Sequence, residues 1–178
     1  MMKVDLQADN MTVTNKAQAH VKGDGIYGKA VFTEYDVDSW KYVHISLNIS
    51  GDPKVLQPGK HAVHIHEKGD CDCEGFKCAG GHFDPGPSGN TDADANHGYH
   101  SGDLPNITIN QNGEGELQTI TTRVTLSDGP VSILQPEEGT SLMVHANPDP
   151  YTPGETGSGH SGGPRLACGR IEAIESTK

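Results

Sequence analysis

Long apolar runs are missing from this sequence: no stretch approaches the roughly 18 residues that a membrane-spanning helix needs. The first residues include a basic side chain but no apolar segment behind it, so we do not expect a secretory leader. We therefore expect no membrane association, and either an intracellular protein or the mature form of an exported one. Glycine (23 residues) and proline (11 residues) are plentiful instead, which indicates many turns rather than long helices.

Basic residues are also scarce. Lysine and arginine number 13 against 24 acidic residues, and the formal net charge is −11. This balance argues against a nucleic-acid partner, whose phosphates require a basic surface. Much of the excess charge is explained by solubility alone. An anionic substrate would have to be attracted by local cations rather than by the protein as a whole.

The apolar residues follow the period of β-strands. In residues 41–50, Val43, Ile45, Leu47 and Ile49 share one face, as expected of a sheet with one buried side. An Asp-Gly pair at 24–25 predicts a hairpin between two extended segments. The segments that we expect to form strands are 17–22, 27–36, 41–50, 59–67, 118–126, 141–145 and 166–174.

Two stretches without this pattern, 68–106 and 146–164, are rich in Gly, Pro, Asp and Ser. Loops of this length in a compact domain are usually functional or disordered, and the first carries candidate ligands. Residues 1–15 lack periodicity and are expected to be an N-terminal extension of a single domain, residues 16–178. Strands without helices at roughly ten-residue spacing predict an all-β fold, an antiparallel sandwich or flattened barrel.

Six of the ten histidines gather in three short segments, which suggests a metal site because neutral imidazole is the commonest protein ligand for copper and zinc. On a strand, His64 and His66 point to the same face, about 6.6 Å apart at ~3.3 Å per residue. His82 follows two glycines that let a loop bend toward an ion, and His145 ends an expected strand. Four imidazoles suit copper. The alternative is that these are ordinary surface, core or turn-capping histidines.

A second group of donors lies between residues 82 and 103. His97, His100 and Asp103 have His82 as their natural fourth member, and three imidazoles with one carboxylate give zinc a closed tetrahedral set. If His82 serves both ions, its ring loses both N–H protons and bridges them as an imidazolate.

Three of the four cysteines, Cys71, Cys73 and Cys78, lie close together, and Cys168 follows almost a hundred residues later. Their spacing lacks the paired two-residue gaps of a structural zinc site. A long-range disulfide from this cluster to Cys168 is the better interpretation, and in the chain-entropy model it would contribute ~3–5 kcal/mol.

Taken together, these segments resemble the copper/zinc superoxide dismutase family over about residues 16 to 174. The resemblance is carried by His64-Ile65-His66-Glu67-Lys68-Gly69-Asp70, Ala79-Gly80-Gly81-His82-Phe83-Asp84-Pro85, His100-Ser101-Gly102-Asp103-Leu104 and Arg165-Leu166-Ala167-Cys168-Gly169. Residues 69–71 and 104–106 look more like the bacterial branch than the animal one. The family implies an immunoglobulin-like Greek-key β-sandwich with two long functional loops, and this enzyme is itself a standard example of that architecture.

The resemblance also implies the chemistry. Superoxide would be converted to dioxygen and hydrogen peroxide by copper redox cycling, with zinc as a structural partner through the bridging His82. Arg165 would attract the anion, and Asp149 would hydrogen-bond ligands of both metals. The disulfide that anchors the first loop would join Cys71 to Cys168. The implied ligands are His64, His66, His82 and His145 for copper, and His82, His97, His100 and Asp103 for zinc.

Some features depart from the family. Its second zinc histidine normally lies well before the third, whereas His97 and His100 are three residues apart, so zinc binding is weakened if His97 does not reach the ion. Cys73 and Cys78 have no counterpart in the usual pattern. They form a second, local disulfide, two free thiols or a copper-scavenging pair. Residues 146–164 hold no Lys or Arg.

Most relatives are homodimers, so we expect a homodimer, with a monomer as the alternative. An intact disulfide favours a periplasmic or other extracytoplasmic location over the cytoplasm. Competing functions are a copper-only dismutase, a module that buffers or delivers copper, and a purely structural sandwich. The copper histidines, the zinc ligands and Arg165 all stand in this sequence, which favours the enzyme that uses both metals.

Overall fold

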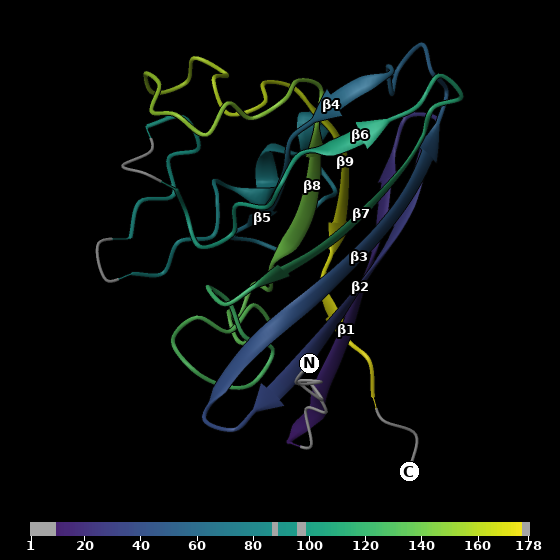
Figure 1. The fold of residues 1–178 in the computed structure, drawn as a ribbon. Helices are drawn as coiled ribbons and strands as arrows, with labels where there is room; N and C mark the ends of the chain where they lie inside the picture. The colour runs from purple at the N-terminus through teal and green to yellow at the C-terminus, as the bar shows by residue number, and fades with distance from the viewer. Residues whose placement is uncertain (1–9, 87–88, 96–98, 176–178) are drawn as a thin grey trace, which may run out of the picture.

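The computed structural model describes residues 10–86, 89–95 and 99–175, and almost every regular element in them is a β-strand (Figure 1). One short 3₁₀ segment, η1 (Glu74–Ala79), interrupts the first long loop. In the described residues no helix is long and apolar enough to span a membrane. The strands are β1 (Met11–Gly23), β2 (Ile26–Val37), β3 (Trp40–Gly51), β4 (Gly59–His61), β5 (Val63–His66), β6 (Ile107–Ile109), β7 (Glu114–Thr121), β8 (Ser141–His145), β9 (Arg165–Arg170) and β10 (Glu172–Ala173).

The strands pair antiparallel in the order β4-β6-β7-β3-β2-β1-β9-β8-β5, and β10 pairs with β1. The two ends of this order, β4 and β5, are consecutive in the chain and separated only by Ala62, so the sheet curls back on itself. The Ala62 amide donates to the carbonyl of Asn147 at 2.9 Å, and its carbonyl accepts from the amide of His145 at 2.9 Å. The result is a nearly closed, flattened barrel, which confirms the predicted all-β antiparallel Greek-key architecture.

Hydrophobic alternation explains how the barrel is filled. On β3, Val43, Ile45 and Leu47 are fully buried, as predicted from their period of two. They pack into one continuous core with residues of the other strands, including Phe32 of β2. The predicted hairpin joins β1 to β2, and Gly25 in its turn has a φ of 64°, a left-handed conformation that glycine adopts without strain.

Several boundaries differ from the predicted ones. β1 begins at Met11, so residues 11–15 pair with β2 and belong to the sheet rather than to an extension. The expected strand 59–67 divides at Ala62 into β4 and β5, because each half pairs with a different partner strand. The expected strand 166–174 is also divided, at Ile171, into β9 and β10, and both of these strands pair with β1.

The buried carboxylate of Glu34 connects several segments at one end of the barrel by hydrogen bonds. Glu34 of β2 is fully buried and accepts hydrogen bonds from the side chains of Thr14, Asn15 and Ser127 and from the amides of Leu126 and Ser127. Burial alone would raise the pKa of Glu34, but these hydrogen bonds prevail and lower it from 4.5 to about 2. Glu34 therefore holds β1 and the loop after β7 onto β2 as an ionised group.

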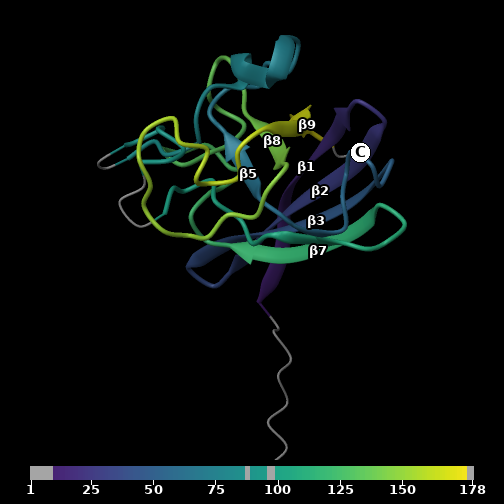
Figure 2. The same cartoon turned by 90° about the horizontal axis from the view of Figure 1, so that it is seen from above.

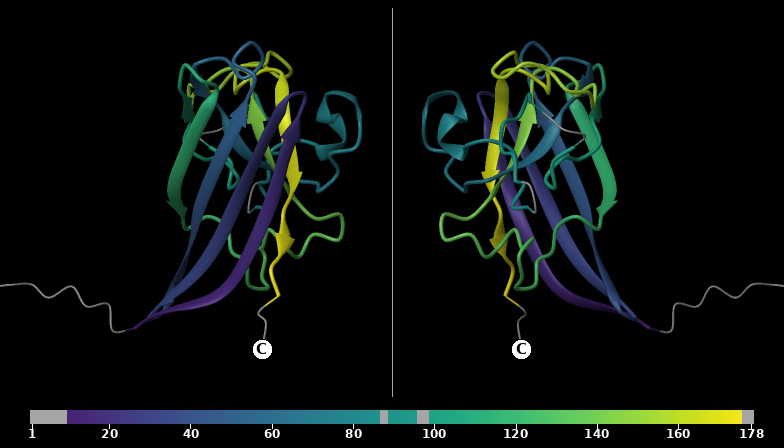
Figure 3. Two further views of the ribbon diagram at one scale, coloured as in Figure 1. Left: turned by 90° about the vertical axis from the view of Figure 1, so that its right-hand side faces the viewer. Right: turned by 90° about the vertical axis from the view of Figure 1, so that its left-hand side faces the viewer.

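The two long loops lie together on one side of the barrel (Figure 2). Asp94 of the first loop is buried and accepts hydrogen bonds from the amides of Gly159 and Ser161 in the second, each at 2.9 Å. By contrast, η1 stands outside the barrel beside β9 (Figure 3). The loops thus meet over β5 and β8, whose ends carry most of the candidate copper ligands.

Candidate metal centre

Four histidines converge on one point between the barrel and the loops. His64 and His66 come from β5, His145 ends the neighbouring β8, and His82 lies in the first loop. All four are buried, and each offers one ring nitrogen that lies within 4.8 Å of the others. The structure therefore brings together the four residues that the resemblance implies for copper.

The strand pairing explains this convergence. β5 pairs with β8 on one side, and on the other His66 forms an isolated bridge with His82, which brings the loop alongside the strand. Gly81 makes this approach achievable. A Cβ at that position would lie only 1.8 Å from the carbonyl oxygen of Thr91, which no larger residue could tolerate.

The ring of His64 is oriented by a buried carboxylate. Its Nε2 hydrogen-bonds Oδ2 of Asp149 at 2.8 Å, and the second oxygen of Asp149 accepts from the amide of Tyr151 at 2.8 Å. With Nε2 engaged, Nδ1 of His64 is left facing the other rings. A carboxylate on the far nitrogen is the common way in which proteins fix the tautomer of a metal-binding histidine.

Backbone carbonyls orient two more rings in the same manner. Nδ1 of His66 contacts the oxygen of Gly80 at 3.0 Å, and Nδ1 of His145 contacts the oxygen of Gly163 at 3.1 Å. Each contact uses one nitrogen as the donor and leaves Nε2 with its lone pair. These two Nε2 atoms lie 3.4 Å apart, so two lone pairs face each other. A cation between them would turn that repulsion into coordination.

Orphaned polar atoms give an independent sign that a cation fits here. Among the described residues, Nδ1 of His64 and Nε2 of His82 are buried without a hydrogen-bond partner. A buried unsatisfied nitrogen costs roughly 1–3 kcal/mol. Both residues belong to the four-histidine group, and a set of four imidazole nitrogens is one that copper accepts.

The opposite edge of the His82 ring belongs to a second group of donors. Nδ1 of His82 lies 3.2 Å from Nδ1 of His100 and 2.8 Å from Oδ1 of Asp103, and these three residues are buried. His82 is thus the one residue common to both groups. Two imidazoles and a carboxylate suit zinc, which needs a fourth ligand to close a tetrahedral site. His97 lies outside the described residues.

Burial keeps three rings of the copper group, those of His64, His66 and His145, neutral and therefore able to donate lone pairs. It lowers the pKa of His64 and of His66 well below the ordinary value, and it lowers that of His145 to about 3. In the second group, burial disfavours the charged forms of His100 and Asp103, but the hydrogen bond between these two side chains outweighs the effect of burial on their pKa values. It raises the pKa of His100 and lowers that of Asp103.

Arg165 lies at the start of β9, beside the copper group. Its guanidinium is half-buried, which lowers its pKa, and it donates from Nη1 to the oxygen of Phe76 and from Nη2 to the oxygen of Gly80, each at 2.7 Å. Its positive charge is close enough to lower the pKa of both His66 and His145. The Gly80 oxygen that accepts from Arg165 also contacts His66, so one carbonyl links the cation to a candidate ligand.

The cysteines form two disulfides. Cys71 joins Cys168 of β9 with an S–S distance of 2.04 Å, and Cys73 joins Cys78 within the first loop. The first pairing fastens the loop to the barrel next to Arg165. The second closes the turn that contains η1.

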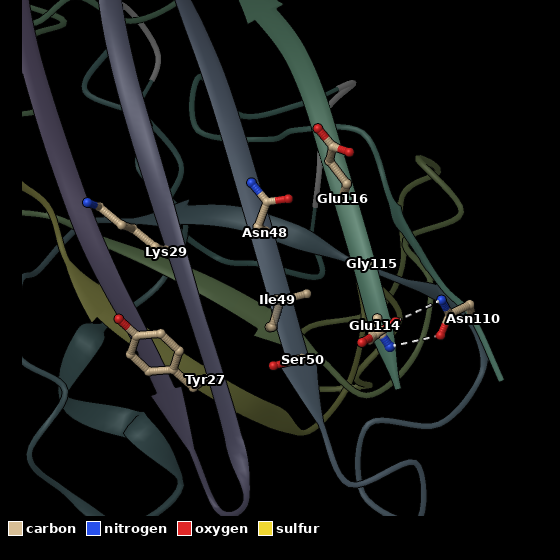
Figure 4. A pocket seen from close by; sticks show the side chains of 9 residues that line it. All are labelled: Tyr27, Lys29, Asn48, Ile49, Ser50, Asn110, Glu114, Gly115 and Glu116. Atoms are coloured by element: carbon tan, nitrogen blue, oxygen red, sulfur yellow. Dashed lines mark hydrogen bonds between the residues drawn. The ribbon is translucent and has the colours of Figure 1, made fainter. Parts of the chain in front are cut away.

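Sequence reasoning missed two groups that shape the centre. Asp94, which braces one loop on the other, carried no recognisable signal beyond its place in a polar loop. The carbonyls of Phe76 and Gly80 are main-chain groups, which a sequence does not mark at all. The hollow in Figure 4 lies on the outer face of β2, β3 and β7, and none of the histidines of the two groups lines it.

The fold and the paired donor groups define a β-barrel protein with a two-metal centre. Residues 26–171 match the family model for copper/zinc superoxide dismutase (SODC). The chain is 37% identical to a Cu-Zn superoxide dismutase of Deinococcus radiodurans, over 84% of this chain and 79% of that protein. It is 35% identical to Cu-Zn superoxide dismutase 2 of Aquifex aeolicus, over 86% of each. The chain belongs to the copper/zinc superoxide dismutase family.

A solved structure agrees with this assignment. The crystal structure of the clock protein EA4 superposes with a TM-score of 0.67 at 28% identity, covering 92% of this chain and 97% of that one. Family membership confirms the predictions of an oxidoreductase, of copper and zinc as its cofactors and of superoxide as its substrate. Several of the matched relatives are bacterial, in keeping with the branch suggested by the motifs.

Proposed function

We propose that this chain dismutates superoxide at a centre in which His64, His66, His82 and His145 hold copper, and His82, His97, His100 and Asp103 hold zinc. The observation that carries this proposal is the set of four inward-facing ring nitrogens within 4.8 Å of one another. When bound, copper supplies the one-electron redox chemistry, and zinc supplies fixed charge and geometry.

The chain's own residues would provide binding, orientation and protons. Asp149, Gly80 and Gly163 hold the rings so that their inner nitrogens need no rearrangement when an ion enters. Nε2 of His82 is buried and has no protein partner among the described residues, so it is the atom that could hold a proton for peroxide formation. Overall, two superoxide anions and two protons give one dioxygen and one hydrogen peroxide.

Arg165 would attract the substrate. The protein as a whole carries a charge of −11, which repels an anion at long range. Close to the centre, the half-buried guanidinium acts with little screening and overrides that field. Lys68, in the first long loop, is another cation that could attract the anion. It is held in an exposed ion pair with Glu138 at 3.2 Å, so its charge is partly cancelled and Arg165 is the stronger candidate.

Two of the competing functions, a protein that buffers or delivers copper and a purely structural sandwich, are separable from the enzyme by experiment. Metal analysis of the native protein combined with pulse-radiolysis measurement of superoxide decay tests all of them. We expect one copper and one zinc per chain with rapid turnover. Bound copper without turnover would favour a protein that buffers or delivers copper, and absence of both metals after loading would favour a structural sandwich.

For the assembly we propose a homodimer, with a monomer as the alternative. Met11, Val13 and Trp40 expose about half of their surface at one end of β1 and β3, and Tyr42 contacts both Met11 and Trp40. Such an exposed apolar group is a typical subunit contact. Light scattering of the metal-loaded protein, compared with a Trp40→Lys variant, tests this assembly.

A further inference from the structure

Arg165 is held in place by main-chain oxygens. In the described part of the chain no carboxylate forms an ion pair with it, and its two hydrogen bonds go to the carbonyls of Phe76 and Gly80. The direction of the guanidinium therefore depends on where the chain places these two oxygens. Gly80 is secured from the barrel side, because the amide of the next residue, Gly81, donates to Glu67 at 2.9 Å.

The Phe76 carbonyl depends on an unfavourable turn. Gly75 and Phe76 have φ values of 64° and 54°, so two consecutive residues adopt the left-handed conformation. Glycine tolerates this conformation, but a residue with a large side chain such as phenylalanine disfavours it. An aromatic residue remains there only if the surrounding structure imposes the turn.

The Cys73–Cys78 disulfide encloses this turn. It joins the residue before η1 to a residue near its end, and inside the ring the amide of Phe76 donates to the oxygen of Cys73 at 3.0 Å. The amide of Cys78 contacts the sulfur of Cys73 at 2.7 Å. The Cys71–Cys168 disulfide attaches the segment to β9, whereas the Cys73–Cys78 disulfide lies wholly within the segment.

We propose that the Cys73–Cys78 disulfide is a positioning element for Arg165 and thereby sets how well the centre attracts a small anion. The inference rests on the proposed role of Arg165. If the disulfide is absent, Phe76 relaxes toward negative φ and its carbonyl turns away. Arg165 then keeps only the Gly80 acceptor and samples more orientations. Copper binding does not depend on the Phe76 carbonyl and remains intact.

The test uses the metal-loaded full chain with azide as a small-anion probe. Azide affinity is read from the visible absorption of the copper(II) protein, and copper and zinc contents are measured in parallel. For the double variant Cys73→Ser/Cys78→Ser we expect unchanged metal content and an azide affinity lower by about threefold. Arg165→Ala alone should lower azide affinity by about tenfold. When Arg165→Ala is combined with the two serine substitutions, its additional effect on azide affinity should be clearly smaller, because the effects of neighbouring groups that act together are not additive.

A second pair of variants tests the turn with both disulfides present. Gly75 and Gly25 have the same φ of 64°, and a Cβ on either would meet nothing closer than 3.8 Å. Alanine at each position therefore imposes the same backbone strain without a clash. We expect Gly75→Ala to lower azide affinity and Gly25→Ala, in the β1–β2 turn, to leave it unchanged.

The outcomes separate the two levels of the proposal. If Arg165→Ala changes neither azide affinity nor turnover, the proposed role of Arg165 fails. A second outcome is that Arg165→Ala lowers azide affinity, while the serine pair neither lowers azide affinity nor reduces the effect of Arg165→Ala. That outcome would overturn the positioning role of the disulfide. Should the serine pair fail to fold with metal, the comparison of Gly75→Ala with Gly25→Ala decides: equal azide affinities overturn the proposal, and a selective loss at Gly75 supports it.

Discussion

His64 and Asp149 are joined by a 2.8 Å hydrogen bond between two side chains that are almost completely removed from solvent. The chain segments that carry them are 85 residues apart. Burial raises the pKa of Asp149 above its ordinary value, and the nearby charge of Asp103 adds to this effect. The bond therefore commits the ring of His64 to one tautomer and connects the second loop to the candidate copper group.

We expect Asp149→Asn to weaken copper binding by about 10–100-fold, the range seen when a group that orients a metal ligand is lost. An amide offers a single acceptor oxygen, so it cannot serve both the ring of His64 and the amide of Tyr151. Copper affinity is measured by competition with a chelator. Asp24→Asn, on the exposed β1–β2 turn, is the control. Equal affinities in the two variants would show that Asp149 does not orient His64.

Glu34 makes the stability of the metal-free protein sensitive to acid. Its pKa falls from 4.5 to about 2 on folding, so the folded state binds fewer protons than the unfolded state between these values. The contribution is fully present above pH 4.5 and is lost as the pH falls toward 2. It amounts to roughly 3 kcal/mol at neutral pH.

Glu34→Gln should therefore lower the free energy of unfolding at pH 7, and the difference from the parent protein should shrink on acidification to pH 3. Urea unfolding of the metal-free protein with intact disulfides measures this. Glu137→Gln removes an exposed carboxylate and should leave stability nearly unchanged at both pH values. A pH-independent difference for Glu34→Gln would mean that shape rather than charge explains its effect.

How far the sequence determines these features differs from residue to residue. The alternation of Val43, Ile45 and Leu47 defined β3, and the same alternation on β2 extends through Phe32 to Glu34, both of which are buried. That register marks Glu34 as buried, but its donors at Leu126 and Ser127 lie more than ninety residues away. The local pattern thus predicts which face of the sheet a residue occupies. It does not predict which distant loop donates hydrogen bonds to a buried polar side chain.

The candidate site shows the same division. The four copper histidines could be recognised because their side chains carry the chemistry, and the His-x-His spacing on a strand fixes a shared direction. The placement of Arg165 could not be derived, because its acceptors are carbonyls of a turn whose left-handed shape depends on tertiary structure. The division of 59–67 at Ala62 likewise follows from closure of the barrel, which cannot be predicted from the local alternation of apolar residues.

The two disulfides should differ in their effect on stability. The Cys71–Cys168 bond spans 97 residues, and in the chain-entropy model a loop of that length contributes about 4–5 kcal/mol. The Cys73–Cys78 bond spans only 5 residues, for which the same model gives about 2 kcal/mol. Guanidinium unfolding of the metal-free Cys71→Ser/Cys168→Ser and Cys73→Ser/Cys78→Ser variants measures both. Equal losses would indicate that the effect lies in the folded structure rather than in the unfolded chain.

The fourth zinc ligand can be identified by separating the two metals. Zinc prefers four ligands, and the described residues supply three, His82, His100 and Asp103. We therefore expect His97→Ala to lower zinc affinity. The loss should be at least the roughly 10–100-fold that is seen when a residue hydrogen-bonded to a metal ligand is removed. Copper content should be retained, since His97 is not a member of the copper set. Zinc affinity is measured by chelator competition on the copper-loaded protein, with the exposed His20→Ala as the control. If His97→Ala and His20→Ala bind zinc equally well while His100→Ala does not, the assignment of His97 is wrong and another group closes the site.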